Sequence, residues 1–376
     1  MGTAPLPDVY LNAIGTATPG HDIHRAFVGW ASARIPDPRE RRLFDRMAAR
    51  AGIDHRFSVL PIGPDGASPV APGGFYADPV LPGTAARMAV YADAAPALAL
   101  RAIAALGPAV SADPGAITHI VVASCTGFTA PGIDQIIARA LGLAPTVERL
   151  LIGFMGCYAA VTALRSARHI VRSVPGARVL VVTVELSSLH LQDTPALEPL
   201  LAMLQFGDGA AAALVSGEAR GLRIDAPFAA TLPDSADLIR WDIGDQGFAM
   251  HLSGEVPGRI ARALAAADLR ALLLGEGPDG KGADRDGPDV IEAVPPVDGW
   301  AVHAGGRSIL DAVEAALGLP DDALDASRAV LRSHGNMSSA TLMFVLARMI
   351  GQPIANGVAL AFGPGLAAEG FRFRAA

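Results

Sequence analysis

Six short apolar runs set the strongest constraint on the fold of this 376-residue chain. Several of them lack polar–apolar alternation, which is typical of β-strands that are covered on both faces. Segments with helical periodicity lie between them, and this alternation predicts a layered α/β architecture. The apolar runs span 117–124, 149–154, 177–186, 210–216, 299–304 and 357–363. The helical segments span 87–106, 134–143, 159–171, 306–319 and 338–350.

A weak internal sequence similarity indicates that the chain contains two related halves. The segments FGDGAAAALVSG and NGVALAFGPGL are both apolar runs bounded by glycine. We place the boundary between Arg220 and Pro227, and we predict an N-terminal half of residues 1–222 and a C-terminal half of residues 223–376. The segment 275–289 is rich in Gly, Pro and Asp, and it predicts an exposed loop.

Composition and charge exclude some classes of function. A net charge of −7 and a pI near 5.7 argue against general nucleic-acid binding, which usually leaves a basic surface. No apolar run reaches the length of a membrane span. The first residues lack the charged-then-apolar order of a signal peptide. We therefore expect the protein to be located in the reducing cytoplasm, where Cys125 and Cys157 form no disulfide.

The segment IGFMGCYAAVTALRSARHIV places Cys157 directly after a glycine, where an apolar run gives way to a helical pattern. The amide groups and the dipole of a helix N-terminus favour a thiolate and lower the pKa of a cysteine there. Cys157 is therefore a candidate nucleophile. Free cysteines also pack in cores without any chemical role, so this segment alone leaves both interpretations open.

Two later segments place a polar residue at a similar junction. In GWAVHAGGRSIL a short apolar strand delivers His303 to a Gly-Gly turn. In SHGNMSSAT, Asn336 precedes Ser338 and Ser339, which are good caps for the following helix. Strand ends converge at one edge of an open α/β sheet, so we expect Cys157, His303 and Asn336 to meet. A lone histidine is more often a core residue whose hydrogen bonds are satisfied. The geometry of the site decides whether His303 is such a residue or a catalytic one.

Together these segments resemble the chalcone synthase superfamily, the type III polyketide synthases. The resemblance rests on the ordered strings GFMGCYAA, FGDGAAAALVSG, WAVHAGGRSILDAVE, SHGNMSSAT and FGPGL, and it extends from Arg46 to Leu366. It implies an α/β thiolase-like fold, in which two similar halves form a five-layer αβαβα arrangement. It also implies a homodimer.

The resemblance implies a role for each of the three polar residues. Cys157 would attack the thioester of a starter acyl-coenzyme A and hold the acyl group covalently. His303 would pair with the Cys157 thiolate. His303 and Asn336 would donate hydrogen bonds to the enolate that forms when malonyl-coenzyme A loses carbon dioxide. The enolate would extend the acyl chain, and the cycle would repeat before ring closure, with no metal or redox cofactor.

Two positions match the family's gatekeepers between the coenzyme A tunnel and the reaction cavity. Phe206, in QFGDGA, matches an aromatic gatekeeper, and its alternative interpretation is an ordinary core phenylalanine. Met250 falls at the second gatekeeper position, where plant members carry phenylalanine. The alignment there crosses a variable loop, and Phe248 is the alternative.

A basic segment is implied to hold the coenzyme. Arg42, Arg46 and Arg50 recur every fourth residue and predict one basic helical face. Arg46 and Arg50 match two basic family positions, which implies contact with coenzyme A phosphates, while Leu43 replaces a third. Ser308 matches a position whose backbone approaches the coenzyme. A solvated basic face without a ligand is the alternative.

The positions implied to line the cavity depart from the chalcone-forming pattern. The strings SCTGF and ELSSLH resemble bacterial members that make alkylresorcinols, alkylpyrones or phloroglucinol-type products. We therefore expect a fatty acyl starter and a product of one of these three kinds. The implied cavity residues are Cys125, Thr126, Ala130, Ser187, His190, Ser338, Gly363 and Pro364.

Three other functions fit parts of the same pattern. An initiating ketoacyl carrier-protein synthase also uses Cys, His and Asn, but it usually follows its histidine with Gln-Ala-Asn, whereas His303 is followed by AGGRSIL. A cysteine hydrolase acting on acyl-coenzyme A shares the residue types but needs no donors for an enolate. A non-enzymatic acyl-binding protein would leave Cys157 without an acyl group.

Overall fold

A nine-stranded mixed sheet dominates the computed structural model, which describes residues 6–61, 68–111, 113–274 and 296–376. The predicted loop at 275–289 lies outside these residues. The strands are β1 (Tyr10–Ala17), β4 (His119–Ser124), β5 (Glu148–Gly153), β6 (Arg178–Leu186), β7 (Asp208–Ser216), β8 (Leu222–Thr231), β11 (Gly299–Val302), β12 (Gly357–Gly363) and β13 (Ala367–Ala375). The six predicted strands are confirmed as β4, β5, β6, β7, β11 and β12.

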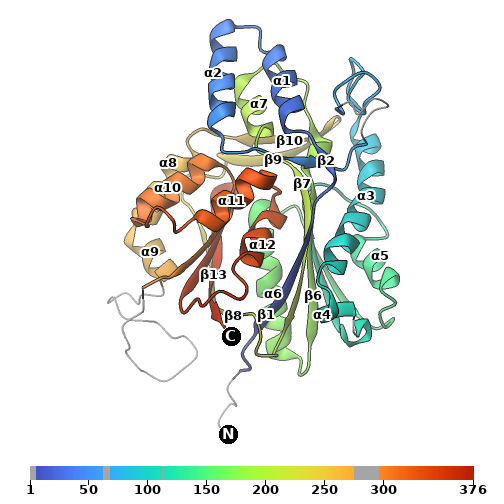
Figure 1. Ribbon diagram of the computed structural model, residues 1–376, viewed down its shortest axis with the longest axis vertical. Helices are drawn as coiled ribbons and strands as arrows, with labels where there is room; N and C mark the ends of the chain where they lie inside the picture. The colour runs from blue at the N-terminus through green and yellow to red at the C-terminus, as the bar shows by residue number, and fades with distance from the viewer. Residues whose placement is uncertain (1–5, 62–67, 112, 275–295) are drawn as a thin grey trace.

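The sheet consists of two similar parts that meet where β8 pairs with β1 (Figure 1). Its strand order is β11-β12-β13-β8-β1-β7-β6-β4-β5. In β1-β7-β6-β4 and again in β8-β13-β12-β11, two antiparallel pairings are followed by a parallel one. The junction involves only two residue pairs, Tyr10 with Arg223 and Leu11 with Leu222. The predicted division after residue 222 falls at the first residue of β8 and stays a prediction.

The two similar glycine-bounded runs in the sequence belong to strands that do not occupy equivalent places in the two parts of the sheet. The runs lie in β7 and β12, but β7 occupies the place in its part that β13 occupies in the other, and β12 corresponds to β6. Every residue of β7 and of β12 is buried. Glycine-bounded apolar runs mark any strand that is covered on both faces, so the similarity does not identify equivalent positions.

Two helices lie between the two parts of the sheet, and six others cover its outer faces (Figure 1). The central helices are α6 (Ala159–Ser173) and α12 (Ser339–Ala347), which share an apolar core with β6, β7, β12 and β13. Residues Ser339 to Leu346 of α12 are all buried, as expected for a helix enclosed by other elements. The outer helices are α3 (Thr84–Ala104) and α5 (Ile133–Ala140) on one part, and α8 (Val256–Ala265), α9 (Ala267–Leu274), α10 (Arg307–Leu317) and α11 (Asp325–His334) on the other. These layers form the expected αβαβα arrangement, and the five predicted helices are confirmed.

A cap of helices and a hairpin covers one end of the sheet (Figure 1). It contains α1 (His24–Arg34), α2 (Pro38–Arg50), α7 (Leu197–Met203), β9 (Ile239–Gly244) and β10 (Gly247–Leu252). The last two strands form a separate antiparallel sheet. Asp37 caps α2 by accepting the Arg39 N–H at 2.7 Å, and Pro38 occupies the first helical position. Short elements are β2 (His21–Asp22), β3 (Phe57–Ser58) and α4 (Pro108–Ser111).

A helix that crosses a membrane must be both long and apolar. Within the described ranges, no helix meets both requirements.

Candidate active site

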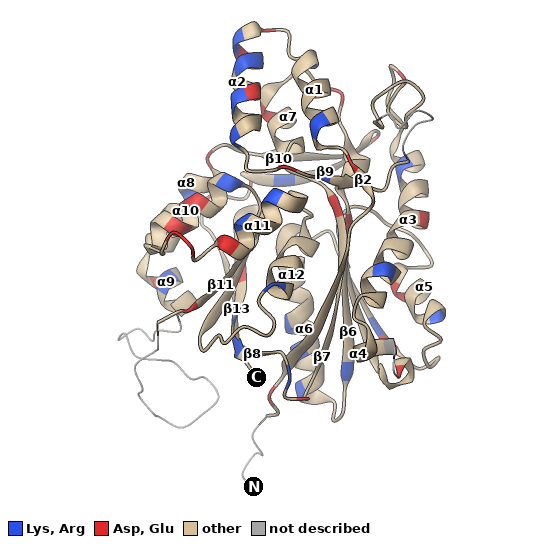
Figure 2. Cartoon of the chain, in the orientation of Figure 1, with Lys and Arg blue, Asp and Glu red and all other residues tan. Residues whose placement is uncertain are grey.

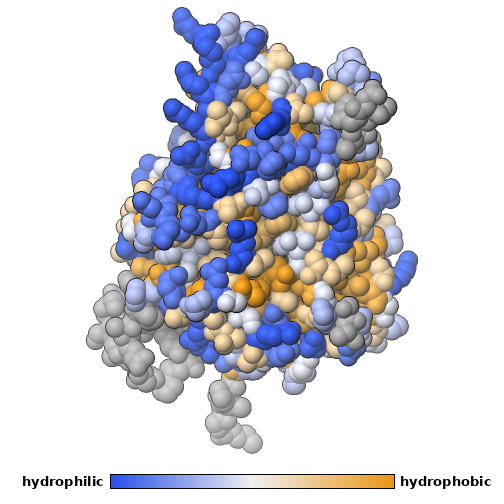
Figure 3. All heavy atoms as spheres, in the orientation of Figure 1, coloured by the Kyte–Doolittle hydropathy of each residue, from blue (hydrophilic) through white to orange (hydrophobic). Residues whose placement is uncertain are grey.

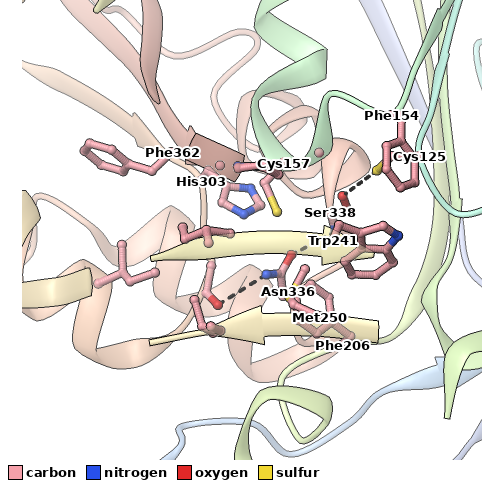
Figure 4. Close-up of a pocket in the computed structure, with 17 residues that line it drawn as sticks. Cys125, Phe154, Cys157, Phe206, Trp241, Met250, His303, Asn336, Ser338 and Phe362 are labelled. Atoms are coloured by element: carbon pink, nitrogen blue, oxygen red, sulfur yellow. Dashed lines mark hydrogen bonds between the residues drawn. The ribbon is translucent and has the colours of Figure 1, made fainter. Parts of the chain in front are cut away.

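Cys157, His303 and Asn336 line one pocket. Cys157 lies in a tight turn between β5 and α6. His303 directly follows β11, and Asn336 lies between α11 and α12. All three residues are buried, and Figure 4 shows the His303 ring and the Asn336 side chain near the Cys157 sulfur. The structure therefore brings together the three junctions singled out in the sequence.

The turn that carries Cys157 packs closely against the loop after β12 at two glycines. Gly156 has a φ of +77°, and a Cβ atom there would lie 2.4 Å from Cδ of Pro364. A Cβ atom on Gly363 would lie 2.6 Å from Cδ1 of Tyr158. Neither position accepts a larger residue without movement of its neighbours. The glycines of GFMGCYAA and FGPGL thus allow the turn and the loop after β12 to pack together.

Hydrogen bonds hold Asn336 in one orientation. Its backbone N–H donates to the Gln205 carbonyl at 2.8 Å, and its carbonyl accepts the Gly207 N–H at 2.9 Å. Its side-chain Oδ1 accepts the Ser338 N–H at 2.8 Å, and its Nδ2 donates to the Gly305 carbonyl at 3.2 Å. An amide nitrogen carries two N–H groups. The second N–H of Asn336 therefore serves the pocket, where it interacts with the Cys157 sulfur and can donate to a substrate oxygen.

Burial favours the neutral forms of both Cys157 and His303 in this pocket. Burial raises the pKa of Cys157 to about 11, although hydrogen bonds with Ser338 and Asn336 act in the opposite direction. Burial lowers the pKa of His303 to about 3, and neither ring nitrogen has a hydrogen-bond partner among the described residues. Burial of the charged forms therefore opposes the thiolate–imidazolium pair that the resemblance implies. The neutral imidazole can instead accept the Cys157 proton.

The other predicted cavity residues lie in different places. Cys125, Ser338, Gly363 and Pro364 line the Cys157 pocket, whereas Ser187 and His190 line a second pocket. Thr126 and Ala130 line neither of the two. The Thr126 hydroxyl donates to Glu185 at 2.9 Å and accepts the Leu186 N–H at 2.8 Å, so it is turned towards β6. Ala130 is exposed on the surface.

Glu185, near the end of β6, is a buried residue that the sequence analysis missed. Its carboxylate accepts the Cys125 N–H and the Cys125 thiol, both at 3.1 Å, and also the hydroxyls of Thr126 and Ser339. Burial raises the pKa of Glu185, and these hydrogen bonds oppose that rise. Beside this network Ser338 adopts a φ of +48°, a conformation that costs a non-glycine residue energy. The sequence does contain a signal for this residue, since Glu185 is a glutamate inside an apolar run. A carboxylate that is buried in this way needs hydrogen-bond partners.

A second pocket adjoins the first. Phe206, Trp241 and Met250 line both pockets, and we call these three side chains the partition. The Trp241 ring centroid lies 6.2 Å from that of Phe206. Met250 borders both pockets, whereas Phe248 borders only the second. The apolar walls of the second pocket include Ile23, Phe27, Leu60, Val70, Tyr76, Leu191, Pro199, Met203 and Phe248.

His190 supports the wall of the second pocket. Its ring stacks on Phe248 with centroids 4.2 Å apart. Its Nδ1 accepts the Phe248 N–H at 3.0 Å, and its Nε2 donates to the Thr126 carbonyl at 2.7 Å. Burial lowers the pKa of His190 to about 4, so the ring is neutral. Both ring nitrogens are occupied, and His190 therefore positions the partition side chain Trp241, whose ring lies 5.8 Å away.

The predicted coenzyme-binding residues lie on the surface, outside both pockets. Arg42, Arg46 and Arg50 are exposed on α2, which carries a row of basic residues in Figure 2. Ser308 is exposed in the first turn of α10. Arg307 Nη1 donates to the Arg50 carbonyl at 3.2 Å, so the end of α2 lies beside the start of α10.

Comparison with known families decides the affiliation of the chain. The pattern of chalcone and stilbene synthases, N-terminal domain, matches residues 8–219, which include Cys157. The pattern of the C-terminal domain of the same synthases matches residues 297–376, which include His303 and Asn336. The chain belongs to the chalcone and stilbene synthase family.

Individual relatives of this family member are known in sequence and structure. Over 266 residues it is 33% identical to the alpha-pyrone synthesis polyketide synthase-like Pks18 of Mycobacterium tuberculosis. The match covers 68% of this chain and 64% of Pks18, which is less than two thirds of that protein. The C-terminal type III polyketide synthase domain of Steely1, a type I/III hybrid from Dictyostelium, is 26% identical, with a TM-score of 0.84 over 98% of this chain and 99% of that domain. PKS-I from the brown alga Ectocarpus siliculosus is 28% identical, with a TM-score of 0.80 over the full length of both chains. The expected thiolase-like fold is thereby confirmed.

Proposed function

We propose that this chain is a type III polyketide synthase. In this proposal it loads a starter acyl group on Cys157, extends that group with malonyl-coenzyme A and closes the product into a ring. The observation that carries the proposal is the enclosed pocket in which a thiol, an unpartnered imidazole and an oriented amide N–H meet.

The first step transfers the starter acyl group. The His303 imidazole accepts the Cys157 proton, and the sulfur attacks the thioester carbonyl carbon of the acyl-coenzyme A. The bond from that carbon to the coenzyme sulfur breaks. Coenzyme A leaves as a thiol with the proton from His303, and the acyl group stays on Cys157 as a thioester.

The second step is decarboxylative condensation. The thioester oxygen of malonyl-coenzyme A accepts hydrogen bonds from Asn336 Nδ2 and from His303, which stabilise the enolate formed as carbon dioxide leaves. The enolate carbon attacks the acyl carbon on Cys157, a carbon–carbon bond forms, and Cys157 leaves as a thiolate that then takes up a proton. The extended chain returns to Cys157 for the next cycle. No metal or redox cofactor enters this cycle.

The second pocket supports a fatty acyl starter. It is lined mainly by apolar side chains, and the partition lines both this pocket and the pocket of Cys157. Burial of each methylene group contributes about 0.8 kcal/mol, so an alkyl chain gains from entering it. We propose a resorcinol, pyrone or phloroglucinol-type product, and the alpha-pyrone synthesis in the name of Pks18 favours the pyrone.

We propose that Arg46, Arg50 and the backbone at Ser308 receive the coenzyme. The two guanidinium groups suit phosphate oxygens. Neither has an ion-pair partner among the described residues. Ser308 lies in the first turn of α10, where free backbone N–H groups favour an anion.

We propose a homodimer formed through the edge of the sheet at β5. This strand is last in the strand order, so one side of its backbone is unpaired among the described strands. Phe128, Leu150 and Leu151 are 41% to 48% exposed there, although they are large and apolar. The exposed Ala130 lies in the same loop as Phe128. A cytoplasmic location is proposed because Cys125 and Cys157 are both free thiols.

Mass spectrometry of products and of intact protein tests the proposal. The protein is incubated with malonyl-coenzyme A and acyl-coenzyme A starters of graded length, beside a Cys157→Ala control. We expect pyrones or resorcinols that form only when Cys157 is intact. Release of free fatty acid without malonyl uptake would indicate a hydrolase, and a single extension that needs a carrier protein would indicate a ketoacyl synthase. Absence of any acyl mass on Cys157 would indicate a binding protein.

A further inference from the structure

The outer face of α2 is a basic surface, while Glu40 and Asp45 are exposed on the flanks of the same helix. The helix buries Phe44 and Ala48. Helical geometry places four exposed arginines on the opposite side, and Figure 3 shows hydrophilic side chains projecting from α2 at the upper left. These arginines are Arg39, Arg42, Arg46 and Arg50. None of their guanidinium groups has an ion-pair or hydrogen-bond partner among the described residues.

Two exposed apolar side chains lie along the same face. Leu43 and Met47, one helical turn apart, are 37% and 44% exposed. Phosphate groups do not require them, because a phosphate is bound by charge and hydrogen bonds. From Arg39 to Arg50 the basic face is about 16 Å long, at 1.5 Å per residue. The face is thus longer and more apolar than the proposed role of Arg46 and Arg50 requires.

The position of α2 relates this face to Cys157. The end of the helix contacts the start of α10 through the hydrogen bond from Arg307 to the Arg50 carbonyl. Gly305 and Ile309, on either side of Arg307, line the Cys157 pocket. A partner on α2 therefore lies at the edge of the segment that borders the site of acylation.

We infer that α2 docks an acidic, amphipathic helix of an acyl carrier protein, which presents an acyl thioester on its pantetheine arm to Cys157. This inference rests on the proposed function. Acidic side chains of the carrier pair with the arginines, and an apolar residue packs between Leu43 and Met47. In the transfer the bond between Cys157 Sγ and the acyl carbon forms, the bond to the pantetheine sulfur breaks, and the arm leaves as a thiol with the Cys157 proton.

The test compares two donors of the same acyl group. Dodecanoyl-coenzyme A and the dodecanoyl-loaded acyl carrier protein of a bacterial fatty-acid synthase are each mixed with the protein, and acyl-Cys157 is followed by intact mass. The variants are Arg39→Glu and Met47→Glu. Both are exposed, and glutamate suits the helix at both positions. Arg270→Glu, on the exposed face of α9, is the matched charge control.

We expect both α2 variants to lower kcat/KM for the carrier donor at least tenfold and for the coenzyme donor less than twofold, with Arg270→Glu changing neither. Added salt should slow the carrier reaction of the unaltered protein more than the coenzyme reaction. Absence of transfer from the carrier, or equal losses with both donors, would overturn the inference. If neither donor acylates Cys157, the proposed function itself fails, so the two failures are distinguishable.

Discussion

Gly156 and Pro364 are far apart in the sequence, yet a Cβ atom on Gly156 would lie 2.4 Å from Cδ of Pro364. The first residue precedes Cys157 and the second follows β12, so this contact joins the two parts of the chain at the nucleophile. It makes the position of the thiol depend on a glycine that contributes no chemistry.

Gly156→Ala should therefore misplace Cys157. We expect acylation to fall at least tenfold and the free energy of unfolding to fall by roughly 2 to 4 kcal/mol, from the positive φ and the collision together. Gly176→Ala is the control, since Gly176 has a φ of +74° with nothing within 4 Å of its Cβ position. It should lose only about 1 kcal/mol and keep its activity. Equal behaviour of the two variants in urea unfolding and acylation would contradict the role of Pro364.

Iodoacetamide alkylation should report the raised pKa of Cys157. With a pKa of about 11, the rate should climb about tenfold per pH unit from pH 7 to 9. The charge of Glu185 raises this pKa and the Ser338 hydrogen bond lowers it. Glu185→Gln should therefore speed alkylation and Ser338→Ala should slow it, as measured by peptide mass spectrometry. A rate plateau near neutral pH would show a thiolate and contradict the neutral pair.

Acid should destabilise the protein partly through His303. Its pKa is about 3 in the folded chain and ordinarily 6.5, so between these values the unfolded chain binds the extra proton. Its contribution to stability is complete above pH 6.5 and is lost as the pH falls towards 3. His303→Asn should reduce the loss of unfolding free energy between pH 7 and pH 5 by about 2 kcal/mol. Glu185 and Asp208 have raised pKa values and act in the opposite direction, so the difference between parent and variant in urea unfolding is the decisive quantity.

Trp241 should control which starters reach the second pocket. Trp241→Ala removes the largest side chain of the partition and should raise kcat/KM for dodecanoyl-coenzyme A relative to hexanoyl-coenzyme A by about tenfold. Val70→Phe places a larger side chain in the second pocket alone, which reduces the space there. It should shift the same ratio the other way. Competition between the two starters, read by product mass, measures both ratios. A uniform loss for both starters would mean that the chain does not enter this pocket.

Strong local patterns carried most of the prediction from sequence. Strands such as β6 and helices such as α6 have long apolar runs or clear periodicity, and their bounds were close to those observed. Cys157, His303 and Asn336 were found because each stands where an apolar run meets a turn or a helix. The sheet then brings such junctions together.

Features that depend on burial in the folded chain could not be predicted from local sequence patterns. Trp241 lies in β9, a hairpin strand with mostly exposed residues, so no apolar run marks it. The pKa shifts of Cys157 and His303 follow from burial, which no local sequence pattern encodes. Thr126 matched a cavity position by its neighbours in sequence, but its hydroxyl bonds to Glu185 instead.

The bridge between Phe206 and Asn336 has a consequence for how such an enzyme can diversify. The backbone of Asn336 bonds to the residues on both sides of Phe206, so a substitution that shifts this phenylalanine also shifts the amide beside Cys157. Trp241 and Met250 stand on the β9–β10 hairpin, which is hydrogen-bonded as its own sheet. That hairpin leaves descendants of this gene free to change the size of the product while the apparatus that makes each carbon–carbon bond is inherited intact.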